Sequence, residues 1–153
     1  MGSEMCIRDR LYIVGRNPTQ QVRQLSRQPN VIVTGAVPDV RPYLVQAWVA
    51  VAPLRIARGV QNKILEAMAM GLPVVGTPAA LQGTWATTTD GVRIAESPRV
   101  FARDLVTLLE DHALRRQCGL QARRYVQEHH QWDEHNARLE ALLHEMVVAQ
   151  AAP

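Results

Sequence analysis

A repeated alternation of short apolar runs with helical segments constrains this fold most. Four runs end in a glycine or proline loop: LYIVG (residues 11–15), NVIVTG (30–35), WVAVAPL (48–54) and PVVGT (73–77). Helical patterns lie between them at residues 19–28, 39–47 and 59–71. Continuous apolar strands that alternate with helices are typical of a parallel sheet covered on both faces and joined by right-handed crossovers. The sequence therefore predicts an α/β fold.

After the fourth run the strand pattern fades and helices predominate. One more short strand is expected in DGVRIAE (residues 90–96), followed by three amphipathic helices. No repeat or linker interrupts the chain, so we predict one α/β unit over residues 11–150 with a helical tail. The apolar faces of the three helices comprise Val100, Phe101, Leu105, Leu108 and Leu109; Leu114, Cys118, Ala122, Tyr125 and Val126; and Leu139, Leu142, Leu143 and Met146.

The first ten residues, MGSEMCIRDR, differ from the rest of the chain. They show no periodicity and precede the first strand pattern. We expect residues 1–10 to be a non-native or unstructured leader, outside the fold.

The composition excludes several classes of protein. At 153 residues and 47% apolar content the chain can bury the core of one domain. It has no apolar run near the roughly 20 residues that span a bilayer, and no secretory signal. Its two cysteines, Cys6 and Cys118, lie far apart without metal or redox spacing, which fits a reducing compartment, and Cys118 is expected to be a buried thiol.

The charged residues favour small anionic ligands over metals or nucleic acid. The net charge is +3, but the basic residues do not interleave with aromatic side chains, so nucleic-acid binding is not expected. The histidines lack carboxylate or thiol partners at ligand spacing, so no metal site is expected.

A basic loop that runs into a helix is the candidate binding site. Ligands of open parallel sheets bind at the carboxyl ends of the strands, where residues 55–59 lie. The helix that follows has no Ser, Thr, Asp or Asn at its expected start, which leaves its first N–H groups uncapped. An uncapped helix start beside Arg55, Arg58 and Lys63 favours an anion, and Gly59 would let a phosphate approach the backbone.

A carboxylate one turn further on has two interpretations. Asn62, Lys63 and Glu66 form the polar stripe of this helix. Glu66 there can accept hydrogen bonds from sugar or ribose hydroxyls. Alternatively, Lys63 and Glu66 form a solvated ion pair worth a few tenths of a kcal/mol, and spacing alone favours this second interpretation.

The whole string PLRIARGVQNKILEAMAMGLPVVGT (residues 53–77) resembles a motif of glycosyltransferase family 4. These retaining, nucleotide-sugar-dependent enzymes carry in their C-terminal domain a Glu-Gly-Phe-Gly loop and a helix reading Glu-Ala-Met-Ala-x-Gly-x-Pro-Val-Val. EAMAMGLPVV fits the helix almost completely, and LYIVGRNP, PNVIVTGAVPDVRPYL, DGVRIAE and HHQWDEH resemble other segments in the same order. The resemblance implies a Rossmann-like domain, the C-terminal half of a GT-B fold, and is strongest to a branch acting in bacterial exopolysaccharide assembly.

The resemblance also implies roles for individual residues. Glu66 matches the second glutamate of the family's Glu-x7-Glu motif, which contacts the ribose. Arg58 replaces the first glutamate, which contacts the donor sugar, and a cation there would face the diphosphate or an acidic sugar. Lys63 and Arg55 are the expected stabilisers of the leaving diphosphate. The expected catalytic residues are thus Arg58, Lys63 and Glu66; the expected donor-binding residues are Arg55, Gly59, Val60, Gln61 and Asn62, with Gly35 and Val37 near the base.

The same resemblance implies partners and location. The donor would be a nucleotide-diphosphate sugar, used without a metal or other cofactor, and the glycan or lipid-linked acceptor would bind an N-terminal domain that this chain lacks. We expect a cytoplasmic enzyme, at the inner face of a bacterial membrane through peripheral association. The isolated chain is expected to be inactive and to self-associate through a helix at residues 134–148.

Two other functions stay open at this point. One is a nucleotide-sugar epimerase of the GT-B fold, and the other is a non-catalytic nucleotide-sugar-binding fragment. Arg58 in place of a glutamate supports both, whereas the complete motif string favours the transferase.

Overall fold

The computed structural model describes residues 10–131, 136 and 139–144. The chain divides into two compact units, residues 1–46 and 47–153, and each is described by itself. The expected leader lies outside the described residues, except for its last residue, Arg10.

The first unit is a two-stranded parallel sheet with three short helices. Strands β1 (Leu11–Val14) and β2 (Val31–Gly35) pair in parallel, with a register shift between Ile13 and Val14. Tyr12 on β1 meets the ring of Tyr43 edge to face at 5.7 Å. The helices are α1 (Gln20–Gln24), η1 (Leu25–Arg27) and α2 (Arg41–Gln46).

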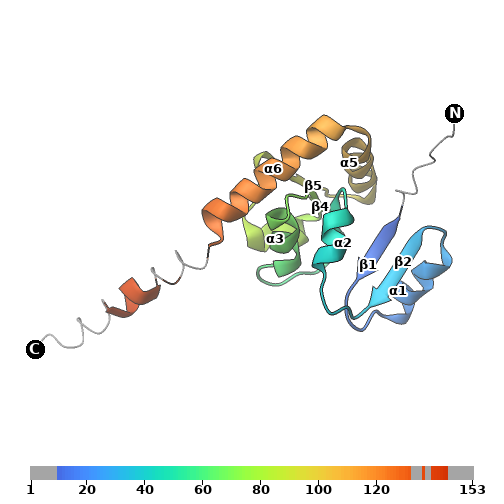
Figure 1. Cartoon of the computed structure of the whole chain (residues 1–153), viewed down its shortest axis with the longest axis horizontal. Helices are drawn as coiled ribbons and strands as arrows, with labels where there is room; N and C mark the ends of the chain where they lie inside the picture. The colour runs from blue at the N-terminus through green and yellow to red at the C-terminus, as the bar shows by residue number, and fades with distance from the viewer. Residues whose placement is uncertain (1–9, 132–135, 137–138, 145–153) are drawn as a thin grey trace, which may run out of the picture. The chain divides into compact units, whose positions relative to one another are not determined.

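The second unit contains a three-stranded parallel sheet in the order β3-β4-β5. Figure 1 labels β4 and β5 of this sheet. Its strands are β3 (Ala50–Ala52), β4 (Val74–Gly76) and β5 (Val92–Ile94). Its helices are α3 (Asn62–Ala69), α4 (Pro78–Leu81), η2 (Gln82–Thr84), η3 (Thr88–Asp90), α5 (Pro98–Glu110) and α6 (His112–His129).

The central strand β4 is buried on both faces. The side chains of its consecutive residues Val74 and Val75 point to opposite faces of the sheet, and they are 1% and 0% exposed. Val75 packs with Leu108 of α5 and Cys118 of α6, while α3 lies against β3 and β4. The parallel pairing, the covered sheet and the buried Cys118 thiol are therefore as the sequence predicts.

Three details differ from the sequence expectation. The strands form two sheets, where one was expected. Strand β3 ends at Ala52 because Pro53 has no N–H to continue the ladder. Helix α3 begins at Asn62, three residues later than expected, because Gln61 is extended (φ −93°, ψ 90°) and Gly59 is left-handed (φ +65°), and neither conformation is helical.

The predicted last helix is only partly described. Residues 139–144 are helical, and Leu139, Leu142 and Leu143 are each more than half exposed. Met146 and the remaining residues of this prediction, except Asn136, lie outside the described residues. No helix in the described ranges is long and apolar enough to cross a membrane.

Glycines allow the backbone of α6 to lie directly against neighbouring turns. A Cβ atom on Gly119 would stand 2.2 Å from the carbonyl oxygen of Gly71, which follows α3. A Cβ on Gly91, at the start of β5, would stand 2.0 Å from the carbonyl oxygen of Cys118. Real Cβ atoms do not approach backbone this closely, so α6 packs at these points only because the side chains are absent.

We predict that Gly119→Ala destabilises the protein. On an exposed helix this change would stabilise by about 1 kcal/mol. Here the new methyl meets the Gly71 carbonyl, so we expect the free energy of unfolding in urea to fall by about 1–3 kcal/mol.

Gln117→Ala is the control on the same helix, because the Gln117 side chain is exposed. It should change the free energy of unfolding by less than about 0.5 kcal/mol. A Gly119→Ala protein as stable as the unchanged one would contradict the close packing of α6.

Candidate functional site

The candidate site lies at the carboxyl ends of the parallel strands of the second unit. Residues 53–61 follow β3, Thr77 follows β4 and Ala95 follows β5. Because the strands are parallel, these segments emerge at one edge of the sheet, where ligands of such sheets bind.

Thr77 ties two of these segments together. Its N–H donates to the Ala52 carbonyl at 3.2 Å, and its hydroxyl donates to the Leu54 carbonyl. The same hydroxyl oxygen accepts from the N–H of Ala80 at 3.2 Å and so caps α4. The loop after β3 is therefore anchored to the end of β4.

Helix α3 begins without a side-chain cap, as the sequence predicts. Its N-cap residue, Gln61, accepts the Ile64 N–H on its backbone carbonyl at 2.8 Å, but its side chain caps nothing. The Gln61 amide instead donates backward to the carbonyls of Arg58 and Gly59, at 3.2 and 3.3 Å. Within the described part of the chain, the backbone N–H groups of residues 59–63 donate no hydrogen bond.

Three cations and one carboxylate are exposed around this helix start, together with the apolar side chains of Ile56 and Val60. Arg55, Arg58, Lys63 and Glu66 are all exposed to solvent. The ion pairs between described residues are Arg41–Asp39, Arg103–Asp104 and Arg124–Glu128, and none involves these four. The interpretation of Lys63 and Glu66 as an ion pair is therefore not supported. The unbonded N–H groups, the positive end of α3 and three cations together favour an anion.

A second segment packs directly on this loop. A Cβ atom on Gly83, within η2, would stand 2.3 Å from the carbonyl oxygen of Gly59 and 2.9 Å from the nitrogen of Val60. Tyr125 of α6 also contacts this segment: its hydroxyl donates a hydrogen bond to the carbonyl of the fully buried Thr84 at 2.8 Å. Burial raises the pKa of the Tyr125 phenol, and the negative charge of Asp90 raises it further, so the phenol is a hydrogen-bond donor at neutral pH.

An open apolar hollow of about 460 Å³ lies beside this segment. Trp85, with 80% of its surface exposed, forms part of its wall. The Thr77-Pro78 dipeptide is a helix-start pattern that could have located α4, but the sequence carries no pattern that predicts the hollow. The lining residues are Pro78, Ala79, Leu81, Gln82, Trp85, Ala86 and Ile94.

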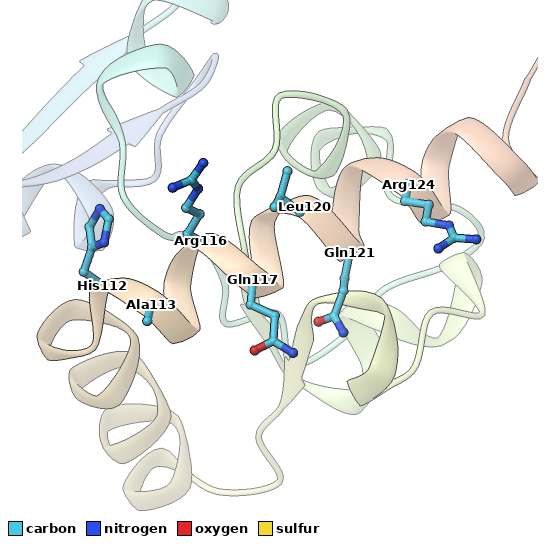
Figure 2. Close-up of a pocket in the computed structure, with 7 residues that line it drawn as sticks. All are labelled: His112, Ala113, Arg116, Gln117, Leu120, Gln121 and Arg124. Carbon is cyan, nitrogen blue, oxygen red and sulfur yellow. The ribbon is translucent and has the colours of Figure 1, made fainter.

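Another open hollow, of about 510 Å³, runs along α6 (Figure 2). His112, Arg116 and Leu120 follow one another along the helix at this hollow, with Arg124 near its end. Arg124 is paired with Glu128 at 2.6 Å, and every lining residue comes from α6. This hollow includes none of the residues that the sequence singles out.

The remaining predicted site residues belong to the first unit. Gly35 ends β2 in a left-handed conformation (φ +72°), and its carbonyl accepts the N–H of Gly15 at 3.2 Å. Val37 is half-buried. Residues 55–66 thus form one continuous loop and helix start in the second unit, whereas Gly35 and Val37 belong to the first unit and are described separately. In the described ranges no cluster of three His, Cys, Asp or Glu side chains could hold a metal ion.

Comparison with known proteins supplies the family. Residues 4–111, more than half of the chain, match the family model described as "Glycosyl transferases group 1". A comparison with curated protein sequences gave no significant match.

Many solved structures match this chain, and three of them illustrate the shared fold. Sucrose-phosphate synthase from Thermosynechococcus elongatus is 20% identical with a TM-score of 0.77, over 92% of this chain and 39% of that one. WaaG, a glycosyltransferase involved in lipopolysaccharide biosynthesis, is 21% identical with a TM-score of 0.67, over 77% of this chain and 34% of that one. The C-terminal domain of a group 1 glycosyltransferase from Francisella tularensis is 22% identical with a TM-score of 0.58, over 74% of this chain and 60% of that one.

These similarities show the fold class and how much of each solved structure the chain spans. The predicted fold class is confirmed: an α/β domain with parallel sheets, like the C-terminal domains of GT-B proteins. The chain spans 39%, 34% and 60% of the lengths of these three structures.

We predict that Gly83→Ala disturbs the loop at residues 59–63. The added methyl would collide with the Gly59 carbonyl, which is backbone and cannot rotate away. We expect the free energy of unfolding to fall by about 1–3 kcal/mol. Hydrogen–deuterium exchange should become faster in the residues around Gly59.

Gln82→Ala, one residue earlier and exposed, is the matched control and should leave both measurements unchanged. Equal exchange rates in the Gly83→Ala and unchanged proteins would show that η2 does not support the loop.

Proposed function

The chain belongs to the group 1 glycosyltransferases, and on that premise we propose that it is the donor-binding part of a retaining enzyme. The enzyme transfers a sugar from a nucleotide sugar to a glycan or lipid-linked acceptor. The observation that carries this proposal is the uncapped start of α3, which follows a strand at the carboxyl edge of a parallel sheet and belongs to a segment with three exposed cations.

The leaving diphosphate is the anion that this site suits. Negative charge develops on the diphosphate as the glycosyl bond breaks, and preorganised donors that face it lower the barrier. The N–H groups of residues 59–63 supply fixed donors, and the dipole of α3 adds positive potential. Lys63 and Arg55 are exposed beside them and supply mobile positive charge.

The rest of the donor extends to either side of the diphosphate. Glu66, one turn into α3, accepts hydrogen bonds from the ribose hydroxyls. Arg58, earlier in the loop, faces the diphosphate or an acidic donor sugar. The backbone of Gly59, Val60, Gln61 and Asn62 lies near the donor. For Gly35 and Val37, in the first unit, the proposal of a role near the base rests on the resemblance of their segment to the family's.

The proposal also covers partners and location. The donor is a nucleotide-diphosphate sugar, and no metal takes part, in keeping with a family of generally metal-independent transferases. The acceptor binds a separate N-terminal domain, and the enzyme acts in exopolysaccharide assembly at the cytoplasmic face of a bacterial membrane. The exposed Leu139, Leu142 and Leu143 support self-association of the chain taken alone.

Arg58 favours a second candidate function. A cation where the family has a donor-sugar glutamate suits a protein that binds nucleotide sugars without transferring them, or an epimerase of the same fold. Assay of sugar transfer by this chain joined to an acceptor domain separates these alternatives, because only the transferase yields a glycosylated acceptor.

We predict that Glu66→Ala weakens binding of a nucleoside diphosphate. Loss of a hydrogen bond to a charged group should cost about 1.5–3 kcal/mol of binding free energy. The measurement is calorimetric titration of the chain with UDP and with GDP. Because Glu66 makes no ion pair with a described residue, the free energy of unfolding should stay within about 0.5 kcal/mol.

Glu110→Ala is the control, since Glu110 is also an exposed helical carboxylate. It should leave the affinity unchanged. If Glu66→Ala binds as tightly as the unchanged chain, Glu66 has no part in the donor site.

A separate prediction concerns Arg58. Arg58→Glu should restore the family's residue and change which nucleotide sugar binds best. The melting temperature should barely move, because Arg58 is exposed and surface substitutions usually stay within about 0.5 kcal/mol.

Titration of both proteins with UDP-glucose, UDP-glucuronate and GDP-mannose measures the donor preference. Arg99→Glu repeats the charge reversal at an exposed residue of α5 and should not alter it. A large fall in melting temperature for Arg58→Glu alone would make Arg58 a structural residue.

A further inference from the structure

Trp85 is the most exposed large hydrophobic side chain of the second unit after Ile56. Its exposed fraction is 80%, and its backbone is left-handed, with φ +59° and ψ 5°. Bulky residues rarely adopt this conformation, which glycine and asparagine adopt far more easily. A tryptophan there contributes little packing and adds backbone strain, so a role in stability does not explain it.

The residues on either side of Trp85 are buried and hydrogen-bonded. Thr84 is fully buried, its hydroxyl donates to the Leu81 carbonyl at 2.7 Å, and its carbonyl accepts from Tyr125. Ala86, next in the chain, is 6% exposed. The strained backbone is therefore fixed by its neighbours, and it displays the indole outward. Such strain, maintained by surrounding structure, tends to occur at functional sites.

The backbone of Trp85 follows a segment that packs on the anion-binding loop. Gly83, two residues before Trp85, packs directly against the backbone of Gly59 and Val60. Since consecutive Cα atoms are about 3.8 Å apart, the Cα of Trp85 lies within about 8 Å of the Cα of Gly83. The hollow of about 460 Å³ that Trp85 borders is of the size of small-molecule pockets, which are mostly apolar with few polar groups.

We propose that Trp85 is a stacking platform for the glycosyl ring of the nucleotide sugar. The apolar C–H face of a pyranose lies on the electron-rich indole face, and the Gln82 amide, which also lines the hollow, is available to the sugar hydroxyls. This inference rests on the proposed donor site. The glycosyl ring is chosen over the base because η2 touches the Gly59 end of the loop, next to Arg58, whereas the ribose is assigned to Glu66 further along α3.

The test compares nucleotide sugars with the matching diphosphates. The unchanged chain and the variants Trp85→Gly, Trp85→Ala and Trp85→Phe are titrated with UDP and UDP-glucose, and with GDP and GDP-mannose. For the pair that binds, Trp85→Gly and Trp85→Ala should raise the Kd of the nucleotide sugar about tenfold, the scale of one aromatic contact. The Kd of the diphosphate should change less than about twofold. Trp85→Phe keeps an aromatic ring and should retain most of the sugar affinity.

Thermal melting separates a ligand role from a structural one. Trp85→Gly relieves the left-handed strain, so its melting temperature should equal or exceed that of the unchanged chain. A lower melting temperature would make Trp85 a packing residue and overturn the inference. Equal losses for diphosphate and nucleotide sugar would assign Trp85 to the base, and unchanged affinities would remove it from the site; either result overturns the inference.

Failure of the donor site itself gives a different result. If the unchanged chain binds none of the four nucleotides, the proposed function is wrong, and the inference falls with it. If the diphosphate binds and is weakened by Glu66→Ala, the donor site stands whatever the Trp85 variants show.

Discussion

Close backbone contact at glycines is the constraint on which the second unit depends. Gly119 brings α6 onto the turn after α3, and Gly91 brings the start of β5 onto the same helix. Gly83 then sets η2 on the loop at Gly59. Each contact leaves no room for a methyl group, so these segments pack backbone against backbone. Rigid support of this kind holds a binding loop in place although its own side chains are exposed.

Electrostatics at the start of α3 follow from the same geometry. Gly59 turns the chain into the left-handed region, which prevents the helix from extending backward through residues 59–61. The N–H groups of residues 59–63 have no hydrogen-bond acceptor among the described residues. Gln61 uses its side chain to brace the carbonyls of Arg58 and Gly59. An unfavourable helix start thus becomes a set of fixed donors for a ligand.

The elements of this fold were largely predictable from local sequence, whereas the contacts between them were not. Apolar runs that end in glycine or proline located β1 to β4, and the segment DGVRIAE located β5. Leu108, Cys118 and Ala122 are buried as expected, whereas Leu109, expected on the same face as Leu108, is 41% exposed. The start of α3 was misplaced because a left-handed Gly59 looks like any other glycine in a helical pattern. The division into two sheets depends on hydrogen bonds between distant strands, which no local pattern encodes. The family motif located residues 55–66, but Trp85 was not singled out, because its exposure depends on Thr84 and Ala86 being buried.

The uncapped start of α3 has a practical consequence for the choice of buffer. Inorganic phosphate and sulfate present the same oxygens as a nucleoside diphosphate, and such anions bind readily at helix N-termini beside cations. They would occupy the loop at Arg55, Arg58 and Lys63 without any base or sugar. A competing anion at ten times its own Kd reduces the apparent affinity of the donor about elevenfold by mass action. Titrations in phosphate buffer would therefore underestimate the affinity of the site for the donor. Titrations in chloride at low ionic strength would give a value closer to the true affinity.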